Sequence, residues 1–185
     1  MNFDRIYLTG FMGSGKSSVA PRLARGLGYD TLDLDDAVVS TTGLSIPALF
    51  DLYGEEHFRK EERQALLATG KKSRLVVSLG GGVISREDNL DWLLNHGVVI
   101  YLKGSAGFLA SRLSQSRRNR PLLFDEHGQQ LEKNALHERV SQLLSQREAR
   151  YERAHFTIDI DARDVRQVVA QIRRLLVQHG GPGKR

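Results

Sequence analysis

Short apolar runs alternate along the chain with longer segments in which apolar residues recur every three or four positions. The short runs are rich in Val, Ile, Leu and Tyr, and they predict five β-strands: Arg5–Thr9, Thr31–Asp33, Leu75–Leu79, Val98–Leu102 and Phe156–Ile160. The longer segments predict six helices: Lys16–Leu27, Ser45–Thr69, Glu87–Leu94, Ser105–Ser116, Gln130–Ala154 and Asp164–His179. This alternation predicts an α/β fold, in which a parallel sheet lies between layers of helices joined by right-handed crossovers.

The composition narrows the class of protein. A chain of 185 residues suits a single domain, residues 1–185, and 40% apolar with 26% charged residues is typical of a soluble globular protein. No apolar run is long enough to span a bilayer, so we expect no membrane partner. The absence of cysteine excludes disulfides, thiolate zinc sites and thiol nucleophiles.

The net charge of +5 favours anionic ligands. The densest basic cluster is Arg117, Arg118 and Arg120, and it contains no aromatic residue that could stack on a base. A cleft that binds small phosphates or carboxylates also needs cations. We therefore expect small anionic substrates rather than nucleic acid.

A phosphate-binding loop lies between the first strand and the first helix. Gly10 to Ser17 reads Gly-Phe-Met-Gly-Ser-Gly-Lys-Ser and matches the pattern G-x-x-x-x-G-K-[ST]. Its glycines allow backbone amides to surround a phosphate, and the helix adds its N-terminal dipole. Lys16 is expected to reach the β- and γ-phosphates and Ser17 to ligate Mg²⁺. The expected ATP-binding residues of the loop are Gly13, Ser14, Gly15, Lys16, Ser17 and Ser18.

Carboxylates and glycines follow the next two strands. Asp33-Leu34-Asp35-Asp36 ends the second strand, where ligands of a parallel sheet gather. Strand alternation would place Asp33 and Asp35 on one face, one assisting the metal and the other accepting a proton from a substrate hydroxyl. Asp36 more simply favours a helix start. The third strand runs into Gly80–Gly82, which permits close approach of the backbone to a ligand.

One charged segment, Arg117–Gly128, separates two predicted helices and contains Pro121. It is either a solvated linker or a mobile lid, and long irregular segments in compact domains are often functional. Three arginines complete the candidate residues: Arg59, Arg120 and Arg147.

The ordered set of motifs resembles the shikimate kinases. Beside the loop and Asp33-Leu-Asp35 it comprises Gly54–Glu62, Gly80–Gly82, Arg120-Pro-Leu-Leu123, and Arg147 with Tyr151. The resemblance runs from about residue 5 to residue 178. It implies a three-layer α/β/α P-loop kinase fold like that of the nucleoside monophosphate kinases, with five parallel strands in the order 2-3-1-4-5. It also implies phosphorylation of the shikimate 3-hydroxyl by ATP, a step of aromatic amino-acid biosynthesis through chorismate.

The resemblance also implies residue roles. Shikimate would be held by Asp35, Arg59, Gly81, Gly82 and Arg147. Asp35 would be the catalytic base, Ser17 and Asp33 would serve Mg²⁺, and Lys16 and Arg120 would stabilise charge on the transferred group. Arg120 would thus also contact ATP, and Arg163 would pack on adenine. The helical segment of about residues 34–70 would bind the acceptor, and residues 117–128 would form the lid.

Two positions depart from the family pattern, and two other functions stay open. Ala149, beside Arg150, stands where the family usually has proline, and either Arg117 or Arg118 could face adenine. The alternatives are a related kinase, such as a gluconate kinase, or a catalytically silent nucleotide-binding regulator. With no secretory signal and a need for ATP, we expect a cytoplasmic protein, and by default a monomer.

Overall fold

The sheet has five parallel strands in the predicted order. A computed structural model describes residues 3–115, 124, 129 and 131–182. Its strands are β1 (Arg5–Thr9), β2 (Asp30–Asp33), β3 (Leu75–Ser78), β4 (Val98–Lys103) and β5 (Phe156–Asp159). The order across the sheet is β2-β3-β1-β4-β5, and every neighbouring pair is parallel. All five strands therefore end at the same edge of the sheet.

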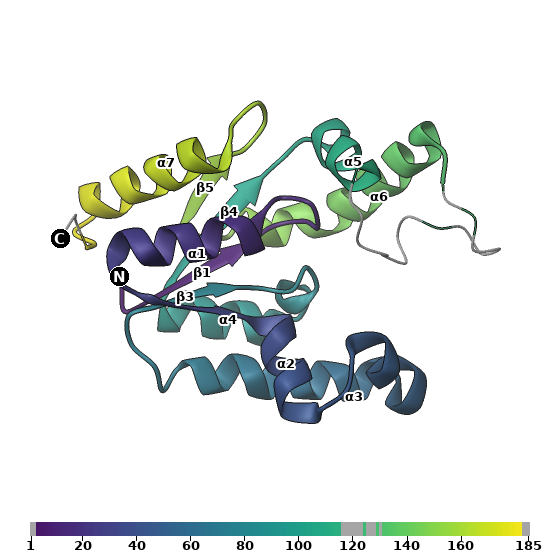
Figure 1. Ribbon diagram of the computed structural model, residues 1–185, viewed down its shortest axis with the longest axis horizontal. Coiled ribbons are helices and arrows are strands. Elements are labelled where there is room, and N and C mark those ends of the chain that lie inside the picture. Colours follow the sequence, from purple (N-terminus) through teal and green to yellow (C-terminus); the bar gives the residue numbers. More distant parts are fainter. Residues whose placement is uncertain (1–2, 116–123, 125–128, 130, 183–185) are drawn as a thin grey trace.

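Helices cover both faces of the sheet (Figure 1). They are α1 (Lys16–Leu27), α2 (Leu34–Thr42), α3 (Ile46–Thr69), the 3₁₀ turn η1 (Val83–Ser85), α4 (Glu87–His96), α5 (Ala106–Ser114), α6 (Lys133–Tyr151) and α7 (Val165–Gln178). Apolar residues of α1 and α7 pack on one face in a single buried cluster. Those of α3, α4, α5 and α6 pack on the other face in a second cluster. The prediction of three layers is confirmed.

The central strands are buried on both faces, which explains why their sequences are apolar almost throughout. β3 is buried at every position, and β4 is buried from Val98 to Leu102. A parallel sheet covered on both faces leaves no solvent side on which polar residues would alternate. The first two residues of β2, Asp30 and Thr31, are exposed at the sheet edge and are polar.

Two local features were not predicted from the hydrophobic pattern, although the family resemblance implies a helical segment of about residues 34–70. The helix α2 begins directly after β2, because the Asp33 carboxylate accepts the backbone N–H of Asp35 and caps the first turn. The long helix α3 is interrupted at Gly54, whose φ of 80° and ψ of 174° are not helical. Glycine is the residue that adopts this conformation without a Cβ clash. The acceptor-side segment therefore consists of α2 and a kinked α3.

None of the described helices is both long and apolar enough to cross a bilayer.

Candidate active site

The phosphate-binding loop has the geometry that the sequence predicts. Gly10 and Gly15 have φ of 141° and 92°, and a Cβ at Gly10 would lie 2.7 Å from the carbonyl oxygen of Leu102. Lys16 is only 9% exposed, and its Nζ donates to the carbonyl oxygens of Gly10 at 2.7 Å and Phe11 at 3.1 Å. An ammonium group held across the mouth of the loop is available for a phosphate that enters it.

Ser14 supplies a further polar group in this loop. Its hydroxyl is buried and has no hydrogen-bond partner among the described residues. A buried polar atom without a partner is costly, and a phosphate oxygen in the loop would satisfy it.

Oxygen donors converge beside the loop, at the end of β2. Ser17 Oγ donates to Asp33 Oδ2 at 3.0 Å, and Asp33 Oδ1 accepts the Asp35 N–H at 3.1 Å. Hydroxyl and carboxylate oxygens are hard ligands of the kind that Mg²⁺ prefers, together with water and phosphate oxygens. The two residues predicted to serve the metal are therefore in contact with each other.

Asp35 reaches the site by a different route from the one predicted. Strand alternation does not place it beside Asp33, because β2 ends at Asp33 and Asp35 lies in the first turn of α2. Its carboxylate instead lies against Gly80, where a Cβ would come within 2.6 Å of Oδ1. Burial raises the pKa of Asp35 above its ordinary value, and the nearby charge of Asp33 raises it further, against the opposing effect of Lys16. Asp35 is thus a half-buried carboxyl group beside the glycine turn.

Arg59 lies against the last glycine of the same turn, Gly82. Its Nη1 pairs with Glu62 Oε2 at 3.0 Å, and its Nη2 pairs with the exposed Glu55 at 3.1 Å. A Cβ at Gly82 would come within 2.6 Å of the guanidinium, so the turn and Arg59 are in close contact. Glu62 is 2% exposed, and burial raises its pKa although Arg59 acts to lower it. Glu62 was not predicted as a site residue, although it lies one helical turn after Arg59.

Arg147 approaches the same turn from α6. Its Nη1 donates to the carbonyl oxygen of Gly81 at 3.3 Å, and its guanidinium lies 5.9 Å from the ring centre of Phe11 in the phosphate loop. The Tyr151 hydroxyl donates to the same carbonyl oxygen at 3.0 Å. α6 runs unbroken through Ala149, so the missing proline does not displace Arg147 from the site.

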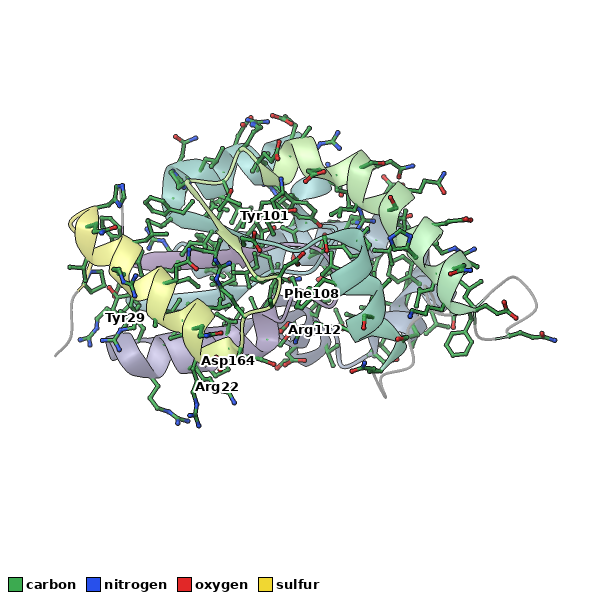
Figure 2. All side chains as sticks on the ribbon, turned by 90° about the horizontal axis from the view of Figure 1, so that it is seen from above. Arg22, Tyr29, Tyr101, Phe108, Arg112 and Asp164 are labelled. Carbon is green, nitrogen blue, oxygen red and sulfur yellow. The ribbon has the colours of Figure 1, made fainter. Side chains whose placement is uncertain are left out.

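A further arginine, Arg112, was not predicted at all. It lies over the ring of Phe108 on α5, and Figure 2 shows the two side chains together. A Cβ at Gly15 would lie 3.5 Å from its guanidinium. The signal was available, because a helix that follows β4 passes the neighbouring phosphate loop of β1. Arg163 lies in the loop after β5, where it pairs with Asp159.

The predicted lid lies outside the described residues except for Phe124, whose carbonyl oxygen accepts a hydrogen bond from Arg139 Nη1 at 2.8 Å. The residues outside include Arg120 and both candidates for the adenine side, Arg117 and Arg118.

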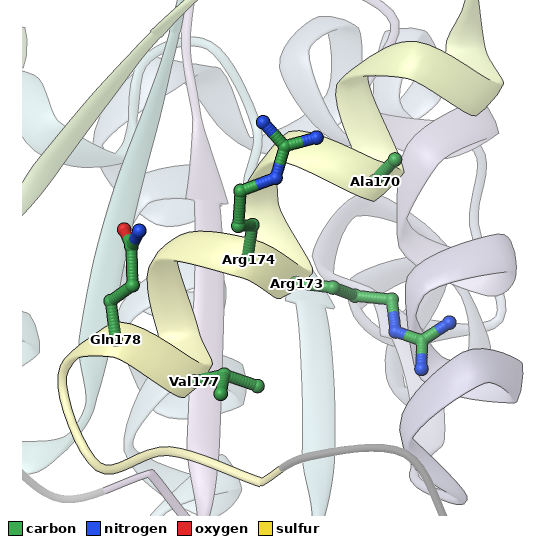
Figure 3. Close-up of a pocket in the computed structure, with 5 residues that line it drawn as sticks. All are labelled: Ala170, Arg173, Arg174, Val177 and Gln178. Carbon is green, nitrogen blue, oxygen red and sulfur yellow. The ribbon is translucent and has the colours of Figure 1, made fainter.

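Two surface hollows differ in their relation to this site. One, of about 770 Å³, lies between α1, β2 and α2, and is lined by Ser17, Asp33 and Asp35 among others. The other lies on the outer face of α7, where Figure 3 shows Arg173 extending toward α1 and Arg174 turned away from it. The second is remote from the loop, the carboxylates and the glycine turn, and it is not part of the candidate site.

Comparison with known proteins identifies the family. The family model for shikimate kinase matches residues 12–177. The chain belongs to the shikimate kinase family. The shikimate kinase of Prosthecochloris aestuarii is 39% identical over 94% of this chain and 88% of its own length. That of Salinibacter ruber is 41% identical over 96% of this chain and 87% of its own length.

Solved structures support the same assignment. The shikimate kinase of Acinetobacter baumannii, solved in complex with shikimate, has a TM-score of 0.84 at 32% identity and covers 96% of this chain and 94% of its own. A gluconokinase from Sinorhizobium meliloti also has this fold, with a TM-score of 0.54 at 20% identity, covering 97% of this chain and 98% of its own. That likeness concerns the fold alone. Membership of the family makes the chain an ATP-dependent phosphotransferase.

Proposed function

We propose that this chain transfers the γ-phosphoryl group of ATP to the 3-hydroxyl of shikimate, giving shikimate 3-phosphate and ADP. The observation that carries the proposal is the pair of guanidinium groups of Arg59 and Arg147 at the Gly80–Gly82 turn, next to the carboxylate of Asp35. Guanidinium groups grip a carboxylate in bidentate fashion, while a carboxylate base accepts a proton from a hydroxyl. A cyclic acid with both groups fits this arrangement.

The roles of the residues follow from their places. Arg59 and Arg147 hold the acceptor carboxylate, and the amides of Gly81 and Gly82 approach the ring. Asp35 binds the hydroxyls and receives the proton of the one that attacks. Its raised pKa makes it a stronger base than an exposed aspartate would be.

The nucleotide side supplies charge stabilisation. The loop residues Gly13, Ser14, Gly15 and Ser18 surround the phosphates, and Lys16 neutralises charge that develops on the moving group. Ser17 and Asp33 would hold Mg²⁺, the latter through water, and the metal would neutralise phosphate charge when bound. Arg112 adds a cation beside the loop, and Arg163 packs on adenine.

The segment of residues 117–128 is proposed to act as a lid. Residues 117–128 fold over the bound substrates and bring Arg120 to the transferred group, with Arg117 or Arg118 facing adenine. The enzyme acts as a cytoplasmic monomer in the pathway to chorismate.

A silent regulator is the less well supported alternative. A protein that only senses nucleotide needs the loop, but it has no use for a buried base and two arginines on the acceptor side. Here the Asp33 carboxylate accepts hydrogen bonds from the Ser17 hydroxyl and from the backbone N–H of Asp35, and so joins the loop to the start of α2. This connection between the nucleotide side and the acceptor side favours a catalyst over a nucleotide sensor.

The test is a stoichiometric assay of the purified chain with ATP, Mg²⁺ and shikimate. We expect one ADP and one shikimate 3-phosphate per shikimate consumed. Lys16→Ala should abolish turnover while shifting the thermal transition by no more than a few degrees. If the wild-type chain forms no phosphorylated product from shikimate, the proposed function is wrong.

A further inference from the structure

Two donors share the carbonyl oxygen of Gly81. Arg147 and Tyr151 are four residues apart on α6 and therefore lie on one face of the helix. The Tyr151 hydroxyl donates to the carbonyl at 3.0 Å and Arg147 Nη1 donates at 3.3 Å. A carbonyl oxygen has two lone pairs and can accept both bonds at once.

The two donors differ in how firmly they are held. Tyr151 is fully buried, and its ring stacks on that of Tyr101 from β4, with centroids 4.9 Å apart and planes 13° apart. This packing fixes the hydroxyl. Arg147 is only half-buried, and beyond Gly81 its guanidinium contacts the face of Phe11 and the Tyr151 hydroxyl itself. Arg147 can therefore leave the carbonyl with little repacking, whereas Tyr151 cannot.

We infer that Tyr151 is a positioning residue that keeps the Gly81 carbonyl bonded while Arg147 turns to the carboxylate of the acceptor. The inference rests on the proposed function, since it assumes a carboxylate as the group that Arg147 receives. Without the hydroxyl, Arg147 would be the remaining side-chain donor to that oxygen among the described residues. Binding the acceptor would then leave a partly buried carbonyl without a protein partner, which weakens acceptor affinity by about tenfold.

Tyr101, which stacks on Tyr151, offers a matched control for the Tyr151 variant. Tyr101 has a buried hydroxyl with no hydrogen-bond partner among the described residues. Tyr151→Phe and Tyr101→Phe therefore remove the same atom from two stacked rings, and only the first removes a bond to Gly81. We expect Tyr151→Phe to raise Kd and KM for shikimate about tenfold, with kcat and KM for ATP nearly unchanged. Tyr101→Phe should leave all four constants at their wild-type values.

A double-mutant cycle tests whether Tyr151 acts through Arg147. In the Arg147→Ala background, Tyr151→Phe should cause no further loss of shikimate affinity. Equal shikimate affinity of Tyr151→Phe and wild type would overturn the inference, as would a collapse of its thermal transition or an additive loss in the cycle. These outcomes are read against a wild-type enzyme that phosphorylates shikimate. Failure of the wild type to do so would contradict the proposed function instead.

Discussion

Asp35 sits half-buried between the end of β2 and the glycine turn, and its raised pKa has consequences for both catalysis and stability. A carboxyl whose pKa is raised in the folded state binds its proton more readily there than in the unfolded chain. Its stabilising contribution is therefore present at low pH and is lost as the pH rises through the folded pKa. At neutral pH the ionised carboxylate costs stability.

Replacing this carboxylate should separate the two effects. We expect Asp35→Asn to lower the catalytic step by roughly 10²–10⁴, the usual range for a positioned general base. Its thermal transition at neutral pH should be equal to or above that of the wild type. When the wild-type rate is measured against pH, the midpoint of its fall on the acid side should come at a pH above about 3.9, the pKa of an ordinary aspartate. A loss of less than tenfold in single-turnover measurements would mean that Asp35 only binds the acceptor.

Arg59 has two roles that a pair of variants can separate. Arg59→Ala should weaken shikimate binding by about 2–5 kcal/mol, while ATP binding changes much less. It should also destabilise the fold by about 3 kcal/mol, because Glu62 is left buried without its partner. The double variant Arg59→Ala/Glu62→Gln should recover most of the thermal stability and none of the shikimate affinity. Calorimetry and thermal melts measure the two quantities, and full affinity in either variant would refute the role of Arg59.

The lid is an element-scale prediction, since it concerns a segment rather than a contact. If residues 117–128 close over bound substrates, they exclude water that would otherwise compete for the phosphoryl group. Trypsin should cut the free protein quickly near Arg117 or Arg118, and ADP with shikimate should slow that cleavage markedly. Arg120→Ala should impair phosphoryl transfer and leave shikimate binding largely intact.

The alternative outcome is a plain linker. Equal cleavage rates with and without both ligands, together with full activity of Arg120→Ala, would support it.

The elements differ in how far the sequence could predict them. The five strands were found within two residues at each end, because buried parallel strands are nearly continuous apolar runs. Their order followed from the family resemblance and not from the pattern. The bounds of α2 do not follow from the hydrophobic pattern, because its nine residues are marked mainly by the cap Asp33. The expectation that strand alternation continues from Asp33 to Asp35 is wrong for the same reason. The break in α3 was also missed, since the apolar period continues on both sides of Gly54.

The sequence predicted which residues belong to the candidate site better than it predicted which of them touch each other. Arg59, Arg147 and the glycine turn meet as expected, because parallel strands end at one edge of the sheet. The buried partner Glu62 could not be inferred, since its pairing with Arg59 depends on helix orientation rather than on a sequence motif. Arg112 was missed although the strand order brings the helix after β4 past the phosphate loop.

At the scale of the whole molecule, the excess positive charge is not concentrated in the active site. The helices α1 and α7, which pack on one face of the sheet, contain no acidic residue. The two helices carry five arginines outside the phosphate loop: Arg22, Arg25, Arg166, Arg173 and Arg174. Their summed charge is as large as the net charge of the whole chain, +5. Among the described residues at the glycine turn, the cation of Arg59 lies close to the carboxyl groups of Asp35 and Glu62. We therefore expect specificity for an anionic acceptor to depend on the placement of the Arg59 and Arg147 guanidinium groups more than on a general positive potential.

The discrimination between two acids tests this account most directly. Gluconate, like shikimate, carries a carboxylate and several hydroxyls, but it is an open chain. With saturating ATP and Mg²⁺, kcat/KM should be at least about 100-fold higher for shikimate than for gluconate. The ring of shikimate holds its hydroxyl at a set distance from its carboxylate, and only then can the glycine turn and Asp35 fix that hydroxyl. Equal kcat/KM for the two acids, or a preference for gluconate, would contradict the account.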